Sequence, residues 1–253
     1  MPIERTYDQL RVRIFSDQPT LATAAARDAA AILRQTIAER GEANLMVATG
    51  NAALQFLAAL RQDKSIDWSK ITVFHMDEYK GISATHPASF RLFIGKNLVE
   101  WVRPKAVYYL EGDAPDSEAE CRRYADLLHR YPIDLCHCGI GENGHLAFND
   151  PPVADFNDPL WVKVVELDQV CRQQQVGEGH FPTLADVPRY ALSVTIPGLL
   201  AARNIICVVP EKRKARAVHD ALLGPIATSC PASILRRQSQ AVLYLDRDSA
   251  SLL

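Results

Sequence analysis

The side chains best suited to chemistry gather in one short stretch, Gly-Ile-Gly-Glu-Asn-Gly-His-Leu-Ala-Phe-Asn-Asp-Pro at residues 139–151. It follows an apolar run at 133–138 that has the composition of a strand, and it carries Asn143, His145 and Asp150. Its glycines permit positive φ and let a ligand approach the main chain. In α/β proteins a polar loop after a strand is a common place for an active site, so we expect a catalytic loop here. The alternative is a tight turn in which His145 serves only as a cap.

A second stretch has the form of a phosphate site. Thr49-Gly50-Asn51-Ala52 joins an apolar strand at 44–48 to a helical pattern. The first N–H groups of a helix have no partner within the helix and carry a partial positive charge, so they attract phosphate. The stretch matches neither the Walker A pattern nor Gly-x-Gly-x-x-Gly, and a nucleotide is therefore not indicated.

Two further charged residues lie where predicted strands end. Asp77 follows the run 71–75, and its carboxylate would reach the same edge of the sheet as the loop 139–151. The alternative for Asp77 is a cap on a turn or helix. Lys214 lies near the start of the helix that follows the run 204–209. There it would either supply a point charge to phosphate or simply be solvated.

Apolar runs of strand length alternate with helical patterns along the whole chain. The candidate strands are 11–15, 44–48, 71–75, 107–110, 133–138, 161–166, 191–195, 204–209 and 241–245. Several are continuously apolar, as in parallel strands that are buried on both faces. Ser117-Glu118-Ala119-Glu120 fits a capping box at the start of one helix. The alternation predicts one α/β domain over residues 1–253, a three-layer, doubly wound, Rossmann-like fold with a mainly parallel central sheet.

The segment between Pro151 and Pro188 departs from this alternation, because it is rich in proline and contains three consecutive glutamines at 173–175. Long irregular segments in compact domains are usually functional. Since this one follows the candidate catalytic loop, residues of about 155–186 are predicted to form a lid over the site. The alternative is a static surface excursion.

Composition excludes several classes of protein. The 253 residues carry a formal net charge of −2, and no basic excess marks a nucleic-acid binder. The sequence contains no run of 18 apolar residues, so no membrane span is predicted, and the N-terminus lacks the apolar core of a signal peptide. Six scattered cysteines predict reduced, buried thiols in a cytoplasmic protein. Cys136 and Cys138 have no second ligand pair, so no metal site is expected.

Taken in order, these segments resemble the glucosamine-6-phosphate deaminase family, which shares its sheet topology with 6-phosphogluconolactonases. The resemblance covers most of the chain. It rests on Thr49-Gly50, Met76-Asp77-Glu78-Tyr79, His86-Pro87-Ala88-Ser89-Phe90, residues 139–151, Val187-Pro188-Arg189-Tyr190-Ala191-Leu192 and Lys214. Lactonases keep the Gly-His pair but replace Ala-Phe-Asn, so the deaminase branch fits better.

The resemblance implies conversion of glucosamine 6-phosphate and water into fructose 6-phosphate and ammonia, with no metal or redox cofactor required. Histidine titrates near neutral pH, so His145 suits opening of the sugar ring, with Asn143 and Asp150 holding it. Asp77 suits the base that moves the C2 proton towards C1. The family usually has a longer acid where Asp150 stands, and one methylene less displaces a carboxylate by roughly 1 Å.

By the same resemblance the phosphate binds the backbone of Thr49, Gly50, Asn51 and Ala52 together with Lys214. The lid arginine of the family has no clean counterpart, and Arg172 and His180 are the basic candidates for that role. No allosteric site is expected, and the protein is predicted to be a monomer or small homo-oligomer that binds a small sugar phosphate, without nucleic-acid or membrane partners.

Two other functions stay open at this point. One is a sugar-lactone hydrolase on the same fold, because fold does not determine function. The other is a non-catalytic sugar-phosphate sensor, suggested by Asp150 and by Asn51-Ala52-Ala53, where many members of the family carry Gly-Thr-Pro. Ammonia release, lactone hydrolysis, or binding without turnover would distinguish the three.

Overall fold

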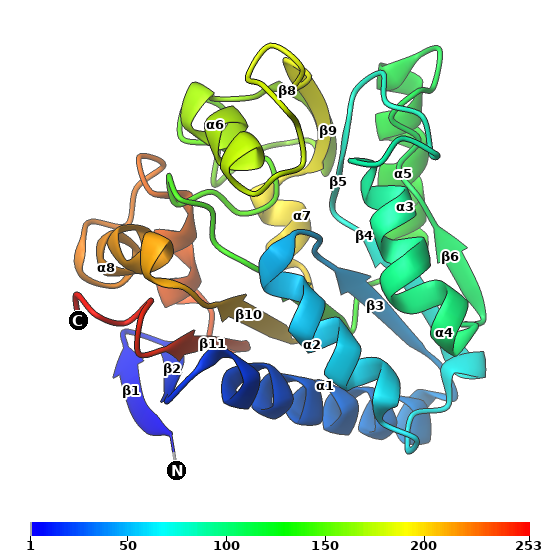
Figure 1. Cartoon of the computed structure of the whole chain (residues 1–253). Coiled ribbons are helices and arrows are strands. Elements are labelled where there is room, and N and C mark those ends of the chain that lie inside the picture. Colours follow the sequence, from blue (N-terminus) through cyan, green and yellow to red (C-terminus); the bar gives the residue numbers. More distant parts are fainter. Residues whose placement is uncertain (1) are drawn as a thin grey trace.

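The computed structural model describes residues 2–253 and has two sheets (Figure 1). The main sheet has eight strands in the order β1-β2-β11-β10-β7-β3-β4-β6, parallel except for the β1–β2 hairpin. Its strands are β1 Ile3–Tyr7, β2 Leu10–Phe15, β3 Ala43–Val47, β4 Ile71–His75, β6 Ala106–Tyr108, β7 Leu135–Cys138, β10 Ile205–Val209 and β11 Ala241–Asp246. The helices are α1 Gln18–Arg40, α2 Asn51–Gln62, α3 Phe90–Ile94, α4 Glu100–Val102, α5 Ser117–Arg130, α6 Gln169–Gly177, α7 Ile196–Leu200 and α8 Ala215–Leu223.

Helices cover both faces of the main sheet, which confirms the three-layer prediction. Successive side chains of a strand point to opposite faces, and β3 illustrates this. Leu45 and Val47 pack with α1 and α2 in one core, whereas Met46 packs in a second core with α5, α7 and α8. Burial on both faces explains why strands such as β3 are continuously apolar.

All nine predicted strands exist, but two of them lie outside the parallel sheet. β8 Val162–Glu166 and β9 Tyr190–Val194 pair antiparallel, and β5 Asp77–Tyr79 joins the other edge of β9. The strands β5 and β1 were not predicted. β5 has only three residues, two of them acidic, and β1 is almost entirely exposed and includes Glu4 and Arg5, so neither has an apolar run.

The predicted lid segment, 155–186, is more ordered in its structure than its composition suggests. It contains β8 and α6, and it contributes Val165, Cys171 and Phe181 to a third core with Tyr79 and Phe148. The segment therefore packs through a core of its own beside the small sheet. Its movement over the site stays a prediction.

Side-chain caps are found at the starts of α1 and α5, and the cap of α5 differs from the predicted one. Asp17 accepts a hydrogen bond from the N–H of Thr20 at the start of α1, and Gly41 ends this helix with φ of 83°. The predicted capping box at Ser117 is wrong. Asp116 is the N-cap of α5 and accepts from the N–H of Ala119 at 2.9 Å.

The chain reverses its direction of travel across the main sheet between β3 and β7. From β3 it proceeds outward to β4 and β6, and from β7 it proceeds the other way to β10 and β11. The loops that follow β3 and β7 therefore diverge above the carboxyl ends of two adjacent strands. Such a switch point leaves a crevice in which open α/β sheets bind ligands.

All six cysteines are free and buried among the described residues, as predicted. No helix within residues 2–253 is both long and apolar enough to span a membrane.

We expect Asp134 to be a main polar link of the sheet, because its buried carboxylate accepts a 2.9 Å hydrogen bond from the N–H of Asn44 and pairs with Arg40 at the end of α1. Asp134→Ala should lower the free energy of unfolding by about 2 kcal/mol, since it leaves a buried N–H without its partner. Urea denaturation measures this. Asp126→Ala, at an exposed position of α5, is the control and should stay within about 0.5 kcal/mol of the parent.

Candidate active site

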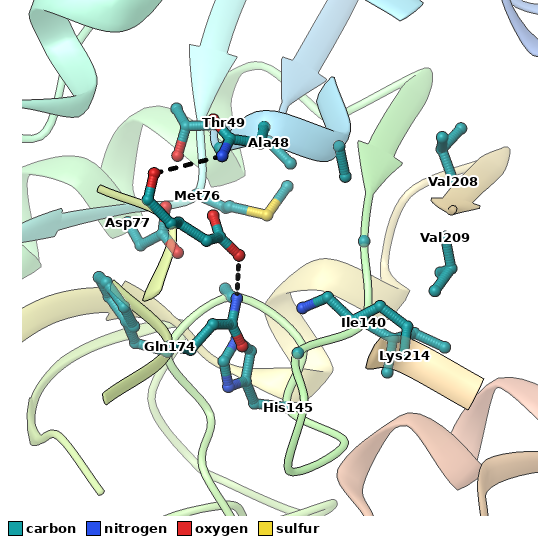
Figure 2. A pocket seen from close by; sticks show the side chains of 18 of the residues that line it. Ala48, Thr49, Met76, Asp77, Ile140, His145, Gln174, Val208, Val209 and Lys214 are labelled. Carbon is teal, nitrogen blue, oxygen red and sulfur yellow. Dashed lines mark hydrogen bonds between the residues drawn. The ribbon is translucent and has the colours of Figure 1, made fainter. Parts of the chain in front are cut away.

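One cavity lies above the carboxyl ends of β10, β7, β3 and β4, at the switch point of the main sheet (Figure 2). It is lined by all of the following: Ala48, Thr49, Gly50, Asn51, Ala52, Met76, Asp77, Phe90, Gly139, Ile140, Gly141, His145, Ala147, Phe148, Gln174, Gln175, Glu178, Val208, Val209, Pro210 and Lys214. The structure thus brings the three sequence-predicted segments, at residues 49–52, 77 and 139–151, together with Lys214. Figure 2 shows Asp77, His145 and Lys214 around the same space.

The loop after β7 holds His145 in a polar network. The imidazole Nδ1 lies 2.9 Å from Oδ1 of Asp150, so the shorter acid still reaches the histidine. Asn143 donates to the same Oδ1 at 2.9 Å, and its own Oδ1 accepts from the N–H of His145. The N–H of Asp168 donates to the other carboxylate oxygen at 3.0 Å. Burial opposes ionisation of Asp150, but these contacts outweigh it and lower its pKa.

Gly141 is the residue that makes room for the imidazole. A Cβ at this position would lie 2.2 Å from His145 Nε2 and 2.2 Å from its Cε1, well inside van der Waals contact. The ring therefore packs flat against the main chain of Gly141. Close approach of this kind is one of the reasons a loop requires glycine.

The pKa of Asp77 is shifted in the opposite direction from that of Asp150. Its side chain is 7% exposed, and its Oδ1 is buried without a hydrogen-bond partner among the described residues. Burial, with the neighbouring charge of Glu78, raises the pKa of Asp77 well above its usual value. A buried carboxyl that lines a cavity and has a raised pKa is a candidate general base.

The phosphate cradle, by which we mean the main chain of Gly50, Asn51 and Ala52 together with Lys214, forms the other part of the cavity. Gly50 has φ of 88°, and α2 begins at Asn51 without a side-chain cap on its first N–H groups. Lys214 is only 4% exposed. Burial lowers the pKa of Lys214, although the nearby charge of Glu178 opposes this. These are the groups that bind an anion at a helix N-terminus.

Glu178 was not among the predicted site residues, and its carboxylate lies against the phosphate cradle. Oε2 is 3.6 Å from the position that a Cβ would take on Gly50. Gln174 donates to Oε1 at 2.7 Å, and Arg213 Nη2 lies 3.2 Å from the same oxygen. Burial opposes ionisation, yet the contacts with His180, Lys214, Arg213 and Gln174 lower the pKa of Glu178 to about 2.

The two basic residues predicted for the lid do not line the cavity. Arg172 Nη2 donates to the main-chain oxygens of Leu184 and Val187 at 2.6 and 2.9 Å, so this guanidinium ties two parts of the segment together. His180 Nε2 lies 3.3 Å from Glu178 Oε2 and thus contacts the cavity only through that carboxylate.

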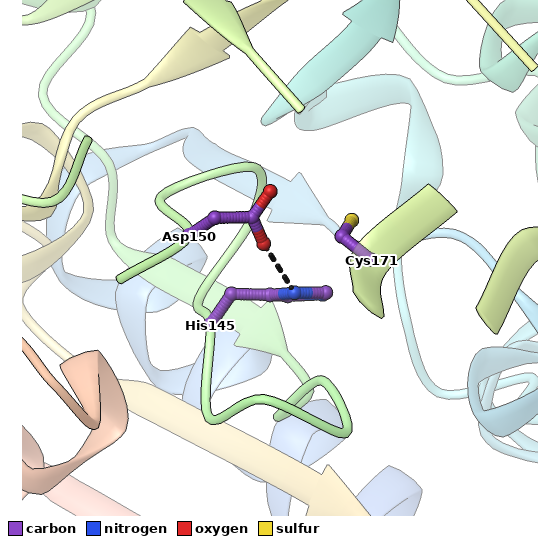
Figure 3. Close-up of side chains that lie close together, drawn as sticks. All are labelled: His145, Asp150 and Cys171. Carbon is purple, nitrogen blue, oxygen red and sulfur yellow. Dashed lines mark ion pairs between the residues drawn. The ribbon is translucent and has the colours of Figure 1, made fainter. Parts of the chain in front are cut away.

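Cys171 of α6 completes a compact group with His145 and Asp150, whose three potential ligand atoms lie within 4.8 Å of one another (Figure 3). Burial and the adjacent charge of Asp150 raise the pKa of the Cys171 thiol well above its usual value. The thiol is therefore protonated, and the two other groups are paired with each other. This arrangement suits a positioned histidine better than a metal centre.

Three residues near the reactive groups were missed because α6 was not predicted. They are Cys171, Gln174 and Glu178, and they come from the segment whose composition appeared irregular. The polar run Gln173-Gln174-Gln175 was the one signal in the sequence that could have indicated these residues. In the structure, Gln174 accepts a hydrogen bond from the N–H of Glu142, and Gln175 accepts one from the Tyr79 hydroxyl.

The chain matches the family model described as glucosamine-6-phosphate isomerases/6-phosphogluconolactonase over residues 16–244. It is 35% identical over 225 residues to a glucosamine-6-phosphate deaminase of Exiguobacterium sibiricum, covering 88% of this chain and 86% of that one. It is 34% identical over 214 residues to a glucosamine-6-phosphate deaminase of Listeria welshimeri, with 84% and 89% covered.

Solved structures give the same picture of the fold. A monomeric glucosamine-6-phosphate deaminase superposes with a TM-score of 0.87 at 31% identity, covering 96% of this chain and 99% of the other. A 6-phosphogluconolactonase from Shewanella baltica superposes with a TM-score of 0.78 at 19% identity, with 97% and 100% covered, and this likeness concerns the fold alone.

Gly141→Ala should displace His145 while leaving the fold intact, because the added methyl overlaps the ring. We expect turnover to fall by about a hundredfold, the usual effect of misplacing a reactive group by 1 Å. The readout is ammonia release from glucosamine 6-phosphate, the substrate that names the similar enzymes. Gly95→Ala is the matched control, since its nearest neighbour would be 4.0 Å away; equal activities of the two variants would contradict the tight packing.

Asp77→Asn should stabilise the protein near neutral pH. A carboxyl whose pKa is raised by folding costs stability once the pH exceeds its unfolded value of about 3.9, and the cost grows as the pH rises through the folded pKa. The variant should therefore gain free energy of unfolding relative to the parent between pH 5 and 8, measured by urea denaturation. Asp150→Asn should show the opposite sign, because the pKa of Asp150 is lowered and its stabilisation is present above its ordinary value.

Proposed function

Because the chain belongs to the family of glucosamine-6-phosphate isomerases and 6-phosphogluconolactonases, we propose that it is a glucosamine-6-phosphate deaminase. The reaction converts glucosamine 6-phosphate and water into fructose 6-phosphate and ammonia. The observation that carries this proposal is the presence in one cavity of an anion-binding helix start, an acid-held histidine and a buried, unpartnered carboxyl.

Ring opening is the step assigned to His145. The ring nitrogen that does not face Asp150 takes the proton from the O1 hydroxyl of the cyclic sugar and returns a proton to the ring oxygen, so that the aldehyde forms. Asp150 stabilises the imidazolium in between, and Asn143 holds the carboxylate. The lowered pKa of Asp150 supports this role, because the group stays ionised at neutral pH.

Asp77 is assigned the isomerisation. Its carboxylate removes the proton from C2, the electron pair forms the C1–C2 double bond, and the carbonyl electron pair moves to O1, which takes up a proton. A proton is then returned to C1 as the nitrogen forms a double bond to C2 and loses an N–H proton, which leaves an imine at C2 and a hydroxyl at C1. Water then adds to C2 and the C–N bond breaks, so that ammonia leaves and the ketose remains. The raised pKa of Asp77 makes its carboxylate a stronger base than an exposed one.

The substrate phosphate is assigned to the phosphate cradle. Thr49 and the main chain of Gly50, Asn51 and Ala52 offer N–H groups, and Lys214 supplies a positive charge from the helix start after β10. Arg172 and His180, which lie outside the cavity, have no direct contact with phosphate in this proposal.

Residues 1–253 act in this proposal as one sugar-phosphate isomerase/deaminase-like domain, because strands of both sheets contribute to the cavity. The similarity to a monomeric deaminase supports a monomer or small homo-oligomer. A small metabolite as substrate and six free cysteines support a cytoplasmic enzyme.

The test is ammonia release from glucosamine 6-phosphate, followed together with formation of fructose 6-phosphate. Equal amounts of the two products support the deaminase. Hydrolysis of 6-phosphogluconolactone without ammonia release would assign the chain to the other branch of the family, and tight sugar-phosphate binding without either product would indicate a sensor.

His145→Gln tests the ring-opening step separately from the isomerisation. The variant should lose at least about a hundredfold in rate with the cyclic sugar, whereas an analogue that is permanently open-chain should react at a rate close to that of the parent, since it bypasses this step. Steady-state rates with both substrates decide the matter. Equal losses with both would mean that the histidine supports the loop or binds the sugar instead.

A further inference from the structure

Resting on the proposed function, we propose that Glu211 and Asp246 are positioning residues of the phosphate cradle. The carboxylate of Asp246 holds Glu211 in a strained main-chain conformation, and this conformation directs Lys214 into the cavity. Affinity for phosphate therefore depends on a main-chain conformation that residues other than glycine disfavour.

Lys214 depends on its main chain for its position. Its ammonium group points into the cavity (Figure 2), and the residue is 4% exposed. Within residues 2–253 the ammonium makes no hydrogen bond and no ion pair, and charges such as that of Glu178 act on it only at longer range. Since no polar contact holds the ammonium in place, the direction in which the main chain enters the helical turn Lys212–Lys214 decides where it lies.

Glu211, three residues earlier, has a main-chain conformation that a side chain disfavours. Its φ is 80° and its ψ is 139°. The other non-glycine residues with positive φ among residues 2–253, which are Asp8, Arg103 and Ala147, have φ of 48 to 52°, as in the left-handed helical region. That region has ψ of about 30 to 60°, so Glu211 lies outside it, near conformations that are found essentially in glycine alone. Such a conformation persists only where surrounding contacts enforce it, and it is typical of functional sites.

Asp246 supplies the contact that enforces this conformation. It is the last residue of β11, and the parallel pairing of β10 with β11 places it beside the segment that leaves β10. Oδ2 accepts a hydrogen bond from the N–H of Glu211 at 3.0 Å, and Oδ1 accepts one from the N–H of Ser249 at 2.7 Å. Asp246 is 5% exposed, so these bonds form away from solvent. On the other side of Glu211, the ring of Pro210 restricts the chain by fixing its own φ.

The strained residue is linked directly to Lys214. The main-chain oxygen of Glu211 accepts a hydrogen bond from the N–H of Lys214 at 3.0 Å, and this bond closes the helical turn Lys212–Lys214. If Glu211 returned to a common conformation with negative φ, its carbonyl would point elsewhere and the bond would be lost. The turn would then start in another direction, and the ammonium would leave the cradle.

The carboxylate of Glu211 has a different role from its main chain. Oε2 accepts a hydrogen bond from Nε of Arg213 at 2.7 Å, and the Glu211 side chain is 35% exposed. Ion pairs near solvent contribute little to stability, so this pair does not explain why the conformation persists. A variant that removes the carboxylate but keeps a Cβ therefore retains the strain, whereas glycine removes both.

The experiment measures phosphate affinity by calorimetric titration of inorganic phosphate at pH 7.5 in two backgrounds, Glu211→Ala and Glu211→Gly. Both backgrounds lack the carboxylate, so they are matched in charge and differ only in the Cβ. With Glu211→Ala, adding Asp246→Ala should weaken phosphate binding about tenfold, as expected when a hydrogen bond to a charged group is lost. With Glu211→Gly, the same addition should weaken binding by less than about threefold, because glycine adopts the conformation without the support of Asp246.

Two further readouts separate positioning from a general loss of structure. Relative to Glu211→Ala alone, the double variant with Asp246→Ala should have a KM for glucosamine 6-phosphate about tenfold higher and a kcat within about threefold, because the phosphate contact is made in the ground state and the transition state alike. Glu211→Gly should melt at a higher temperature than Glu211→Ala, since it removes the strain. Ser249→Ala is the matched control. It removes other hydrogen bonds of Asp246 but not the one to Glu211, so it should bind phosphate as the parent does.

Equal losses from Asp246→Ala in both backgrounds, or no loss in either, would overturn the inference. Equal melting temperatures of Glu211→Gly and Glu211→Ala would overturn it as well. A parent protein that does not bind inorganic phosphate overturns the phosphate cradle and this inference with it. Binding and melting are read without turnover. A parent that binds phosphate but releases no ammonia from glucosamine 6-phosphate therefore overturns the proposed function alone, and the two backgrounds still decide the inference.

Discussion

The reversal of the chain path between β3 and β7 is the constraint on which the site depends. Parallel strands place all of their carboxyl ends at one edge, and the reversal separates the two loops at the middle of that edge. The loop after β3 leads into the uncapped start of α2, and the loop after β7 has the length to carry His145 and its acid. The ends of β4 and β10 add Asp77 and the segment with Lys214 on either side.

Within this frame, burial and pairing give three carboxylates different properties. Asp77 is buried without a partner, and its pKa is raised. Asp150 and Glu178 are also buried, but hydrogen bonds and positive charge lower the pKa of each. Carboxyl groups whose environments move their pKa values apart have different roles in one site. In the proposed mechanism Asp77 is the base and Asp150 supports the histidine.

The sequence predicted those parts of the structure that depend on short segments. Strands buried on both faces appear as apolar runs, and Thr49, Asp77 and the loop 139–151 follow such runs directly, so topology alone brings them together. Glu178 was not predictable in this way. Its place depends on α6, whose packing rests on distant aromatic residues of the third core. The contacts of Arg172 with main-chain carbonyls also depend on the folding of this segment, so the sequence did not predict them.

The central claim is that the buried carboxyl of Asp77 carries the C2 proton. The most direct measurement is a single turnover of glucosamine 6-phosphate deuterated at C2, with the label located in the product by NMR. Because Asp77 is 7% exposed and its Oδ1 is buried, a proton held there exchanges slowly with solvent. We predict that part of the deuterium is recovered at C1 of fructose 6-phosphate. Complete loss of the label to solvent, with none at C1, would contradict the assignment of a shielded base.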